Sequence, residues 1–227
     1  MPFVILLVLV VLLLSSLPTL WIKFQLNRYS KHREDIQGTG GELAQHLVEK
    51  LKLDDVEVLP GDSDYYSATE KAVYLSAPIY NGKSIAAVAV AVHEIGHALQ
   101  HKNNDRLFSL RQTLAPTALI FQKMAILIIY LMPFVTFLVK SPIAILFFAM
   151  VAIGCFLIAV LFHLITLPLE FDASFNKALP IIEKCEFLNE SDMPGARKVL
   201  KAAALTYVAS SLLKMINVYT WWRVLKR

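Results

Sequence analysis

Three long apolar runs divide the chain into membrane-like and polar segments. Residues 3–22 contain no charged side chain, and as a helix they would extend about 30 Å, the thickness of the hydrocarbon core of a bilayer. Residues 116–139 form a second run, with Gln122 and Lys123 near its start, and residues 143–167 form a third without Asp, Glu, Lys or Arg. This pattern predicts three membrane-spanning helices, with the lysine side chain extending to an interface.

Only Lys140, Ser141 and Pro142 separate the second and third runs. So short a connection predicts a transmembrane helical hairpin over residues 116–167, and a hairpin returns the chain to the membrane side that it left. The polar segments before and after the hairpin are therefore expected on the same side of the membrane.

The first run is predicted to be an uncleaved anchor. A cleaved signal peptide is the alternative, but no Lys or Arg precedes the run and no Ala-x-Ala cleavage signal follows it. Four cations come directly after the run, at Lys23, Arg28, Lys31 and Arg33. Because cytoplasmic loops carry an excess of positive charge, we expect residues 23–115 in the cytoplasm.

The polar segment between the first two runs carries signals for a helix and for short strands. Thr39 and Glu42 have the spacing of a capping box, which predicts a helix from there to about residue 51. Residues 56–59 and 71–76 resemble strands, and the Pro-Gly-Asp-Ser-Asp sequence between them is typical of a turn. We therefore predict a short β-hairpin.

The end of the chain is predicted to be helical. Residues 196–222 have helical periodicity with one apolar face. Lys214 interrupts this stretch, so an interfacial or protein-packed helix explains it as well as a fourth span does. The predicted organisation is an anchor at 1–22, a cytoplasmic half at 23–115, the transmembrane hairpin at 116–167, and a C-terminal unit at 168–227.

Composition supports a membrane protein. Of the 227 residues, 56% are hydrophobic and 18% are charged, and the mean hydropathy is +0.55, which is too apolar for an ordinary soluble domain. The net charge of +4 could indicate nucleic-acid binding, but many cations lie beside apolar runs, as membrane-flanking residues do. We therefore predict the lipid bilayer as a partner and no nucleic acid. Two cysteines give no disulfide framework.

The candidate chemistry lies in the sequence His-Glu-Ile-Gly-His at residues 93–97, on a helix that Ser84 can cap. In a helix His93 and His97 are one turn apart on one face and can share a metal ion. Glu94 lies about 100° round the helix, close to where a metal-bound water would be. This is the zinc metalloprotease pattern of two histidine ligands and a general base. The apolar residues on both sides predict a buried helix, in which unpaired polar groups would be costly.

A zinc site with two histidines needs a third protein ligand to leave a fourth position for water. Glu170 is a candidate because the predicted hairpin returns it, at the membrane exit, to the side of His93 and His97. The alternative is that Glu170 lies at the start of a helix after Pro168, where the helix dipole favours a carboxylate. Spacing alone does not decide between a metal ligand and such a helix-start residue. His101 lies on the same helix face, but among polar residues at the helix end, so we predict a solvated side chain.

Several separate motifs resemble the YugP-type bacterial membrane zinc metallopeptidases. They are His-Glu-Ile-Gly-His-Ala-Leu-Gln at 93–100, Leu-Pro-Leu-Glu-Phe-Asp-Ala-Ser at 167–174, and the Gly-Ala-Arg-Lys-Val-Leu-Lys sequence that begins at 195. The likeness runs over nearly the whole chain. It implies a mainly α fold with a zincin-like, gluzincin-type metallopeptidase core on a helical membrane domain, Zn²⁺ as the cofactor, and a place in the plasma (inner) membrane of a bacterium.

The chain also resembles, more distantly, the HtpX and CAAX-prenyl membrane proteases. Their third ligand is a Glu early in a later helix, which implies Glu170 here, and an Asp four residues later holds a ligand histidine. This chain has Ser174 at that position and Asp172 two residues after the glutamate, so either could orient a histidine. The family also tends to have Asp-His-Tyr-Asp where this chain has Asp-Tyr-Tyr-Ser at 64–67. Because the His and the final Asp of that motif are absent here, the resemblance implies no role for the residues in their places.

These observations predict an integral, multi-pass membrane zinc metalloendopeptidase with its active site facing the cytoplasm. His93, His97 and Glu170 hold Zn²⁺, and Glu94 takes a proton from the attacking water as the catalytic base. The substrates are unfolded or membrane-proximal polypeptides, which could pair with the strand at 71–76.

Two other classes of function are compatible with the sequence. A non-catalytic membrane scaffold or regulator would close a structural zinc site with a fourth protein ligand, such as His101, His163 or Asp172. A small transporter with the metal as cargo would line its spans with ionisable residues, of which His163 is the clear example. Tyr207 and Arg197 are candidates for stabilising an oxyanion, and nothing in the sequence specifies an oligomeric state.

Overall fold

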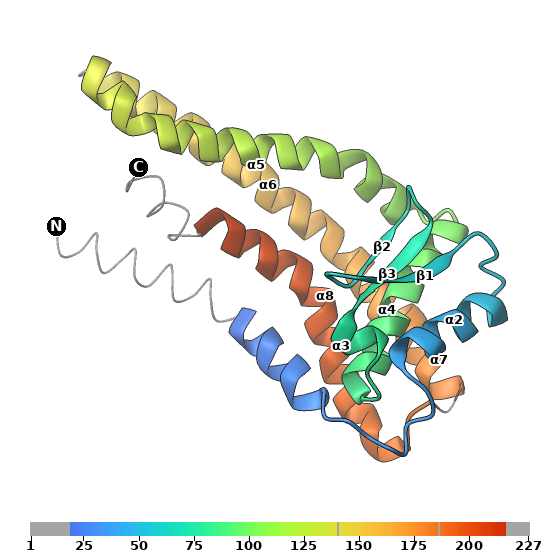
Figure 1. The fold of residues 1–227 in the computed structure, drawn as a ribbon. Coiled ribbons are helices and arrows are strands. Elements are labelled where there is room, and N and C mark those ends of the chain that lie inside the picture. The colour runs from blue at the N-terminus through green and yellow to red at the C-terminus, as the bar shows by residue number, and fades with distance from the viewer. Residues whose placement is uncertain (1–18, 140, 186, 217–227) are drawn as a thin grey trace.

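The chain is mainly helical, with one small sheet (Figure 1). The computed structural model describes residues 19–139, 141–185 and 187–216, so most of the predicted anchor lies outside the described residues. Residues 19–29 are helical. The elements that follow are α2 (Gly40–Lys50), β1 (Glu57–Gly61), β2 (Tyr65–Ser67), β3 (Ala72–Ser76), α3 (Ala77–Tyr80), α4 (Ile85–Lys102), α5 (Arg106–Val139), α6 (Pro142–Phe171), the π-helix η1 (Asp172–Ala178), α7 (Leu179–Lys184), the 3₁₀ turn η2 (Glu190–Asp192) and α8 (Met193–Ile216).

A polar lobe is built around α4, which is buried over most of its length. Helices α2, α7, η1 and α8 all pack against it. The side chain of Ser84 accepts a hydrogen bond from the backbone N–H of Ala87 at 3.0 Å, and Thr39 and Glu42 make both hydrogen bonds of a capping box. The two predicted helix starts are therefore confirmed.

The prediction of a hairpin between the two expected strands is wrong. β1 and β3 correspond to those strands, but they pair in parallel, with Val58 opposite Val73. The antiparallel partner of β3 is β2, a three-residue strand that the sequence pattern was too short to reveal, and the strand order is β1-β3-β2. Because β3 is paired on both edges, it cannot also pair with a substrate as expected. β2 occupies the edge of the sheet.

Helices α5 and α6 form a long hairpin that projects from the polar lobe (Figure 1). This confirms a helical hairpin, although α5 already begins at Arg106. Many of its large apolar side chains are exposed, among them Phe134, Phe137, Leu138, Ile143, Leu146 and Phe147. Among the described residues, Arg106–Met132 is long and apolar enough to cross a membrane, and Leu146–Cys155 is a shorter apolar helix.

The polar residues after the hairpin do not start a new helix. Pro168 lies inside α6, and Glu170 is in the last turn of α6, which continues directly into η1. A helix start after Pro168, the alternative explanation for the Glu170 carboxylate, is therefore wrong. η1 lies against α4, where a Cβ atom on Gly96 would be only 2.8 Å from the carbonyl oxygen of Ala173. The absence of a side chain at Gly96 thus lets the two backbones come together beside the predicted ligands.

Candidate metal centre

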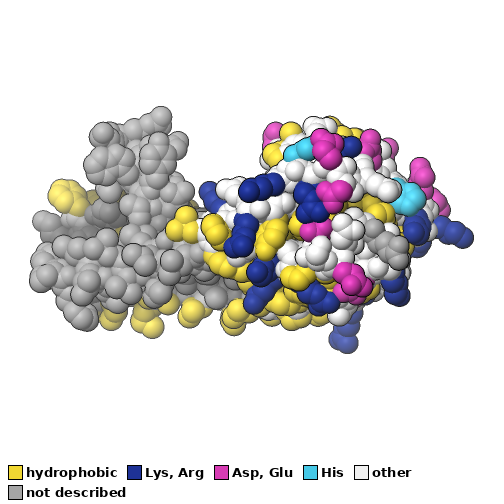
Figure 2. Space-filling view, turned by 90° about the horizontal axis from the view of Figure 1, so that it is seen from below, with side chains coloured by type: hydrophobic (Ala, Val, Ile, Leu, Met, Phe, Trp, Pro, Cys, Tyr) yellow, Lys and Arg dark blue, Asp and Glu magenta, His cyan; other side chains and the backbone are white. Residues whose placement is uncertain are grey.

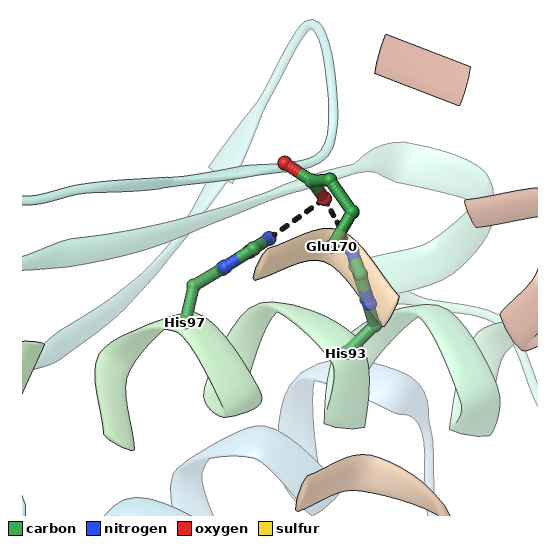
Figure 3. A group of neighbouring side chains, drawn as sticks. All are labelled: His93, His97 and Glu170. Atoms are coloured by element: carbon green, nitrogen blue, oxygen red, sulfur yellow. Dashed lines mark hydrogen bonds and ion pairs between the residues drawn. The ribbon is translucent and has the colours of Figure 1, made fainter. Parts of the chain in front are cut away.

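His93 and His97 on α4 and Glu170 on α6 point toward one another (Figure 3). Oε2 of Glu170 lies 3.2 Å from Nε2 of His97 and 3.5 Å from Nε2 of His93. The three potential ligand atoms all lie within 4.8 Å of one another, and all three side chains are buried. The structure thus brings together the three residues that the sequence singled out as metal ligands.

A buried glutamine fixes the ring of His97. The amide oxygen of Gln100 lies 2.9 Å from Nδ1 of His97. The amide nitrogen of Gln100 donates to the carbonyl oxygen of Leu169 at 3.0 Å and to Oδ2 of Asp172 at 2.8 Å. Both amide hydrogens are used in this way, so the oxygen faces the imidazole as an acceptor. It follows that Nδ1 of His97 carries a proton and that Nε2 is the ring nitrogen that faces Glu170.

A buried serine does the same for His93. The hydroxyl of Ser174 donates to the carbonyl oxygen of Leu200 at 3.0 Å, and its oxygen lies 2.9 Å from Nδ1 of His93. Since the hydroxyl has one hydrogen, its contact with the imidazole must be an accepted hydrogen bond. His93 is therefore also protonated on Nδ1, and its Nε2 faces Glu170. Ser174 contacts a histidine directly, whereas Asp172 reaches one only through Gln100.

The donor set fits a zinc ion. Two imidazole nitrogens and a carboxylate oxygen converge on one point, and atoms of these kinds are the ligands that zinc takes in proteins. Ligands at about 2.0–2.1 Å from a tetrahedral zinc ion are about 3.3 Å apart. The distances of 3.2 and 3.5 Å from Glu170 to the two histidines are close to that value.

Arg111 on α5 holds the second oxygen of Glu170. Its Nη1 donates to Oε1 of Glu170 at 2.7 Å. Burial opposes ionisation of this carboxyl group, but His97, His93 and Arg111 together hold the pKa of Glu170 well below its ordinary value. One carboxylate oxygen is thus committed to the guanidinium, and the other faces the two histidines.

Glu94 lines the same cavity as the three cluster residues, a space of about 410 Å³. Its side chain is almost fully buried, and burial raises its pKa to about 7. A carboxyl group with such a pKa can both accept and release a proton near neutral pH. Further lining comes from the β1–β2 connection, β2 and α5, at Ser63, Asp64, Tyr65, Tyr66, Phe108, Arg111 and Gln112.

Other predicted residues lie elsewhere. Nδ1 of His101 is 2.8 Å from the hydroxyl of Tyr66, and His101 is not in the metal cluster found among the described residues. Arg197 is exposed and donates to Glu183 at 2.7 Å, rather than lining the described part of the cavity. The side chains of His163 and Tyr207 lie outside the described residues.

Two contributors to the site were missed from the sequence. Gln100 follows His97 by three residues and is a polar side chain on an apolar helix, so helical spacing could have identified it as a neighbour of that histidine. Arg111 gives no such signal, because its contact with Glu170 depends on how α5 and α6 pack.

A histidine pair on one helix, a glutamate from a later helix and a buried carboxyl group beside them are the parts of a zinc-peptidase centre. The chain belongs to the family described as "Putative neutral zinc metallopeptidase", whose sequence profile matches residues 4–226. Zinc is the metal of that family, and the cluster of His93, His97 and Glu170 could hold it.

The chain is also similar to a protein of Bacillus subtilis (strain 168) named "Putative membrane protease YugP". The two are 37% identical over 200 residues, which cover 87% of this chain and 85% of that protein. No solved structure matches the chain.

Proposed function

We propose that this protein is an integral membrane zinc-dependent metalloendopeptidase. The observation that carries the proposal is the convergence of two histidine Nε2 atoms and one carboxylate oxygen in a cavity that Glu94 also lines. Three protein ligands leave a fourth position of a tetrahedral zinc ion for water, as hydrolysis requires. Family membership and the name of the similar Bacillus protein support the same class of reaction.

In this mechanism His93, His97 and Glu170 hold the metal. Zinc, when bound, supplies a Lewis acid that acidifies water and polarises a peptide carbonyl. Glu94 takes the proton of the attacking water and later delivers it to the leaving amine, a role supported by a pKa raised to about 7 through burial. Arg111 keeps Glu170 ionised and limits it to one free oxygen.

The proposed substrates are unfolded or membrane-proximal polypeptides. β2 lies at the edge of the sheet, and its residues Tyr65 and Tyr66 line the cavity. An extended peptide can add to such an edge through backbone hydrogen bonds. Arg111 and Gln112 bring the first turns of α5 to the same cavity, so a bound peptide would lie close to the base of the hairpin.

The proposed location is the plasma (inner) membrane, with an anchor at 3–22, a hairpin at 116–167 and the active site facing the cytoplasm. The exposed apolar side chains of α5 and α6 support insertion of the hairpin, since a soluble protein rarely exposes so many together. Figure 2 shows Lys and Arg side chains on the described surface of the molecule. Lys23, Arg28 and Lys31, which follow the proposed anchor in the sequence, are exposed, and cations beside the end of a span are typical of the cytoplasmic face of a bilayer.

A structural zinc site in a scaffold is the alternative, and it needs a fourth protein ligand. Two candidates for that ligand have other partners: His101 is hydrogen-bonded to Tyr66, and Asp172 to Gln100 and Asn176. In the described part of the chain the potential metal cluster has three members. Three protein ligands favour an open, catalytic zinc site over a closed, structural one.

The direct test is Glu94→Gln in the full-length, detergent-solubilised protein. We expect zinc content to stay equal to that of the wild type and peptide cleavage to fall at least about 100-fold, since a positioned general base contributes that much or more. Glu49→Gln, the same change at an exposed position of α2, is the control and should leave both measurements unchanged. Undiminished cleavage by zinc-loaded Glu94→Gln protein would remove Glu94 from the mechanism.

A further inference from the structure

We infer that Tyr66 is a specificity-determining residue that closes one end of the metal cavity and limits the size of the substrate side chain bound there. The inference deepens the proposed function and rests on it, because it takes the metal cavity to be the place where a peptide is cleaved. It assigns a class of substrate: peptides with a small residue, such as Gly, Ala or Ser, at the position that faces Tyr66.

A second cavity lies next to the metal cavity. It has a volume of about 350 Å³ and is lined by residues 52–56 between α2 and β1, by Lys71 directly before β3, and by the last turns of α4. Helix α4 lies under both spaces, because His97 lines the metal cavity and Ala98 lines the second one. Among the residues that the structure describes, Tyr66 is the one that lines both cavities. Its side chain therefore forms the wall between them.

Three contacts hold the ring of Tyr66 in this wall. Its hydroxyl oxygen lies 2.8 Å from Nδ1 of His101. Its ring centroid is 5.8 Å from that of His101 and 6.3 Å from that of Phe108. Phe108 is 3% exposed, and its ring stacks on His101 with the centroids 5.2 Å apart. Because the hydrogen bond and both ring contacts fix the same aromatic group, moving that group out of the wall would break all three.

The wall lies close to the metal ligands. His101 follows His97 by four residues on α4, and the Cβ atoms of residues so spaced in a helix are about 5–6 Å apart. Successive residues of an extended peptide are about 3.3 Å apart. The hydrogen bond between His101 and Tyr66 is therefore about two substrate residues away from the metal. Tyr66 thus faces a substrate side chain near the scissile bond.

The wall excludes a large substrate side chain. The metal cavity has a volume of about 410 Å³, and this space must hold the peptide backbone and the side chains on both sides of the bond that is cleaved. A large side chain directed at Tyr66 could enter the second cavity only by displacing the ring, with loss of its contacts. A small residue fits without this displacement. Discrimination by size in a pocket is worth about 10–200-fold in kcat/KM.

The test compares peptide selectivity in full-length, zinc-loaded protein in detergent. Quenched fluorescent peptides carry either Ala or Trp at each position in turn on both sides of the scissile bond, and mass spectrometry locates the cut. For the wild type we expect kcat/KM to favour Ala over Trp at one position within about two residues of the cut. In Tyr66→Ala the Ala-to-Trp ratio of kcat/KM should fall about 10–100-fold at that position and stay unchanged at the others.

Two variants separate the volume of the ring from other effects. Tyr66→Phe keeps the ring and its contact with Phe108, so it should keep the wild-type ratio. Tyr65→Ala removes a ring from the adjacent position of β2, where it stacks on Tyr74 and is not part of the described lining of the second cavity. Whatever its effect on the overall rate, Tyr65→Ala should not lower the ratio at the position that faces Tyr66.

A third variant tests whether the two cavities join when the ring is removed. Val56 is half-buried and lines the second cavity. Val56→Phe alone should leave the selectivity unchanged, because Tyr66 separates this position from the substrate. Combined with Tyr66→Ala it should restore the preference for Ala, since it fills the space that the first substitution opens. Thermal midpoint and zinc content are measured for every variant, and Tyr66→Leu replaces Tyr66→Ala if the latter does not fold.

The inference is overturned if the Tyr66→Ala or Tyr66→Leu protein folds and binds zinc but keeps the wild-type ratio at every position. It is also overturned if Tyr65→Ala lowers the same ratio equally, or if Val56→Phe does not reverse the change, because the site would then only have become looser. Cleavage by the wild type with no preference between Ala and Trp would overturn the inference alone. A wild-type protein that cleaves none of the peptides would overturn the proposed function, and the inference with it.

Discussion

Arg111 and Glu170 are joined across the hairpin by a 2.7 Å hydrogen bond from Nη1 to Oε1. The arginine comes from the first turns of α5, and the glutamate from the last turn of α6. The two helices that form the hairpin therefore also hold the third potential ligand in place.

Arg111→Met should destabilise the metal-free protein. It leaves the Glu170 carboxylate, which is 3% exposed, without its charged donor, and loss of such a partner costs about 1.5–3 kcal/mol. Chemical unfolding of metal-free protein in detergent measures the effect. In a double-mutant cycle with Glu170→Gln, most of this cost should disappear, since the buried charge has been removed. Equal costs of Arg111→Met in both backgrounds would show that the pair is not coupled.

Glu170→Ala should reduce zinc affinity by more than about 100-fold, beyond the loss typical of a residue that only orients a ligand. Zinc content after dialysis and chelator competition provide the measurement. Glu183→Gln on α7, an exposed carboxylate paired with Arg197, is the control and should bind zinc as the wild type does. If Glu170→Ala retained wild-type affinity, a different residue would complete the site.

Gly96→Ala should disturb both stability and metal binding. The added Cβ would lie 2.8 Å from the backbone oxygen of Ala173, so η1 would have to move away from α4. We expect a loss of roughly 1–3 kcal/mol, accompanied by weaker zinc binding because Glu170 and Ser174 move with η1. Gly154→Ala on α6 is the matched control, since a Cβ there meets nothing within 4 Å. Indistinguishable behaviour of the two variants would contradict the close-approach argument.

Cleavage should depend on pH through Glu94. Burial raises the pKa of Glu94 to about 7. The base must be ionised, so activity is lost as the pH falls through its pKa. A zinc charge nearby favours the carboxylate and moves this acid limb lower, so we expect its midpoint at or below about pH 7. A profile of kcat/KM against pH checks the prediction, and an acid limb centred well above pH 7 would contradict it.

The local part of the site could be predicted from the sequence. His93, Glu94 and His97 are fixed relative to one another by helical spacing, and spacing is a property of a short segment. The returning hairpin made Glu170 a candidate but left the alternative open, and the family resemblance selected it. The capping residues Thr39 and Ser84 were evident for the same local reason, and both make the expected hydrogen bonds.

What could not be predicted depends on contacts between distant segments. The parallel pairing of β1 with β3 requires a crossover, and β2 is too short for its pattern to show. The continuation of α6 through Pro168 was missed because a proline normally marks a helix boundary. Arg111 joins the site only through the packing of α5 on α6, which no pattern within either helix specifies.

The separation of the ligands along the chain has a consequence for biosynthesis. Glu170 follows His97 by 73 residues, and the whole hairpin is translated between them. A nascent chain that has exposed α4 but not the end of α6 carries both histidines and Glu94 without the third ligand. The three potential metal ligands can therefore come together only after almost all of the hairpin has been synthesised.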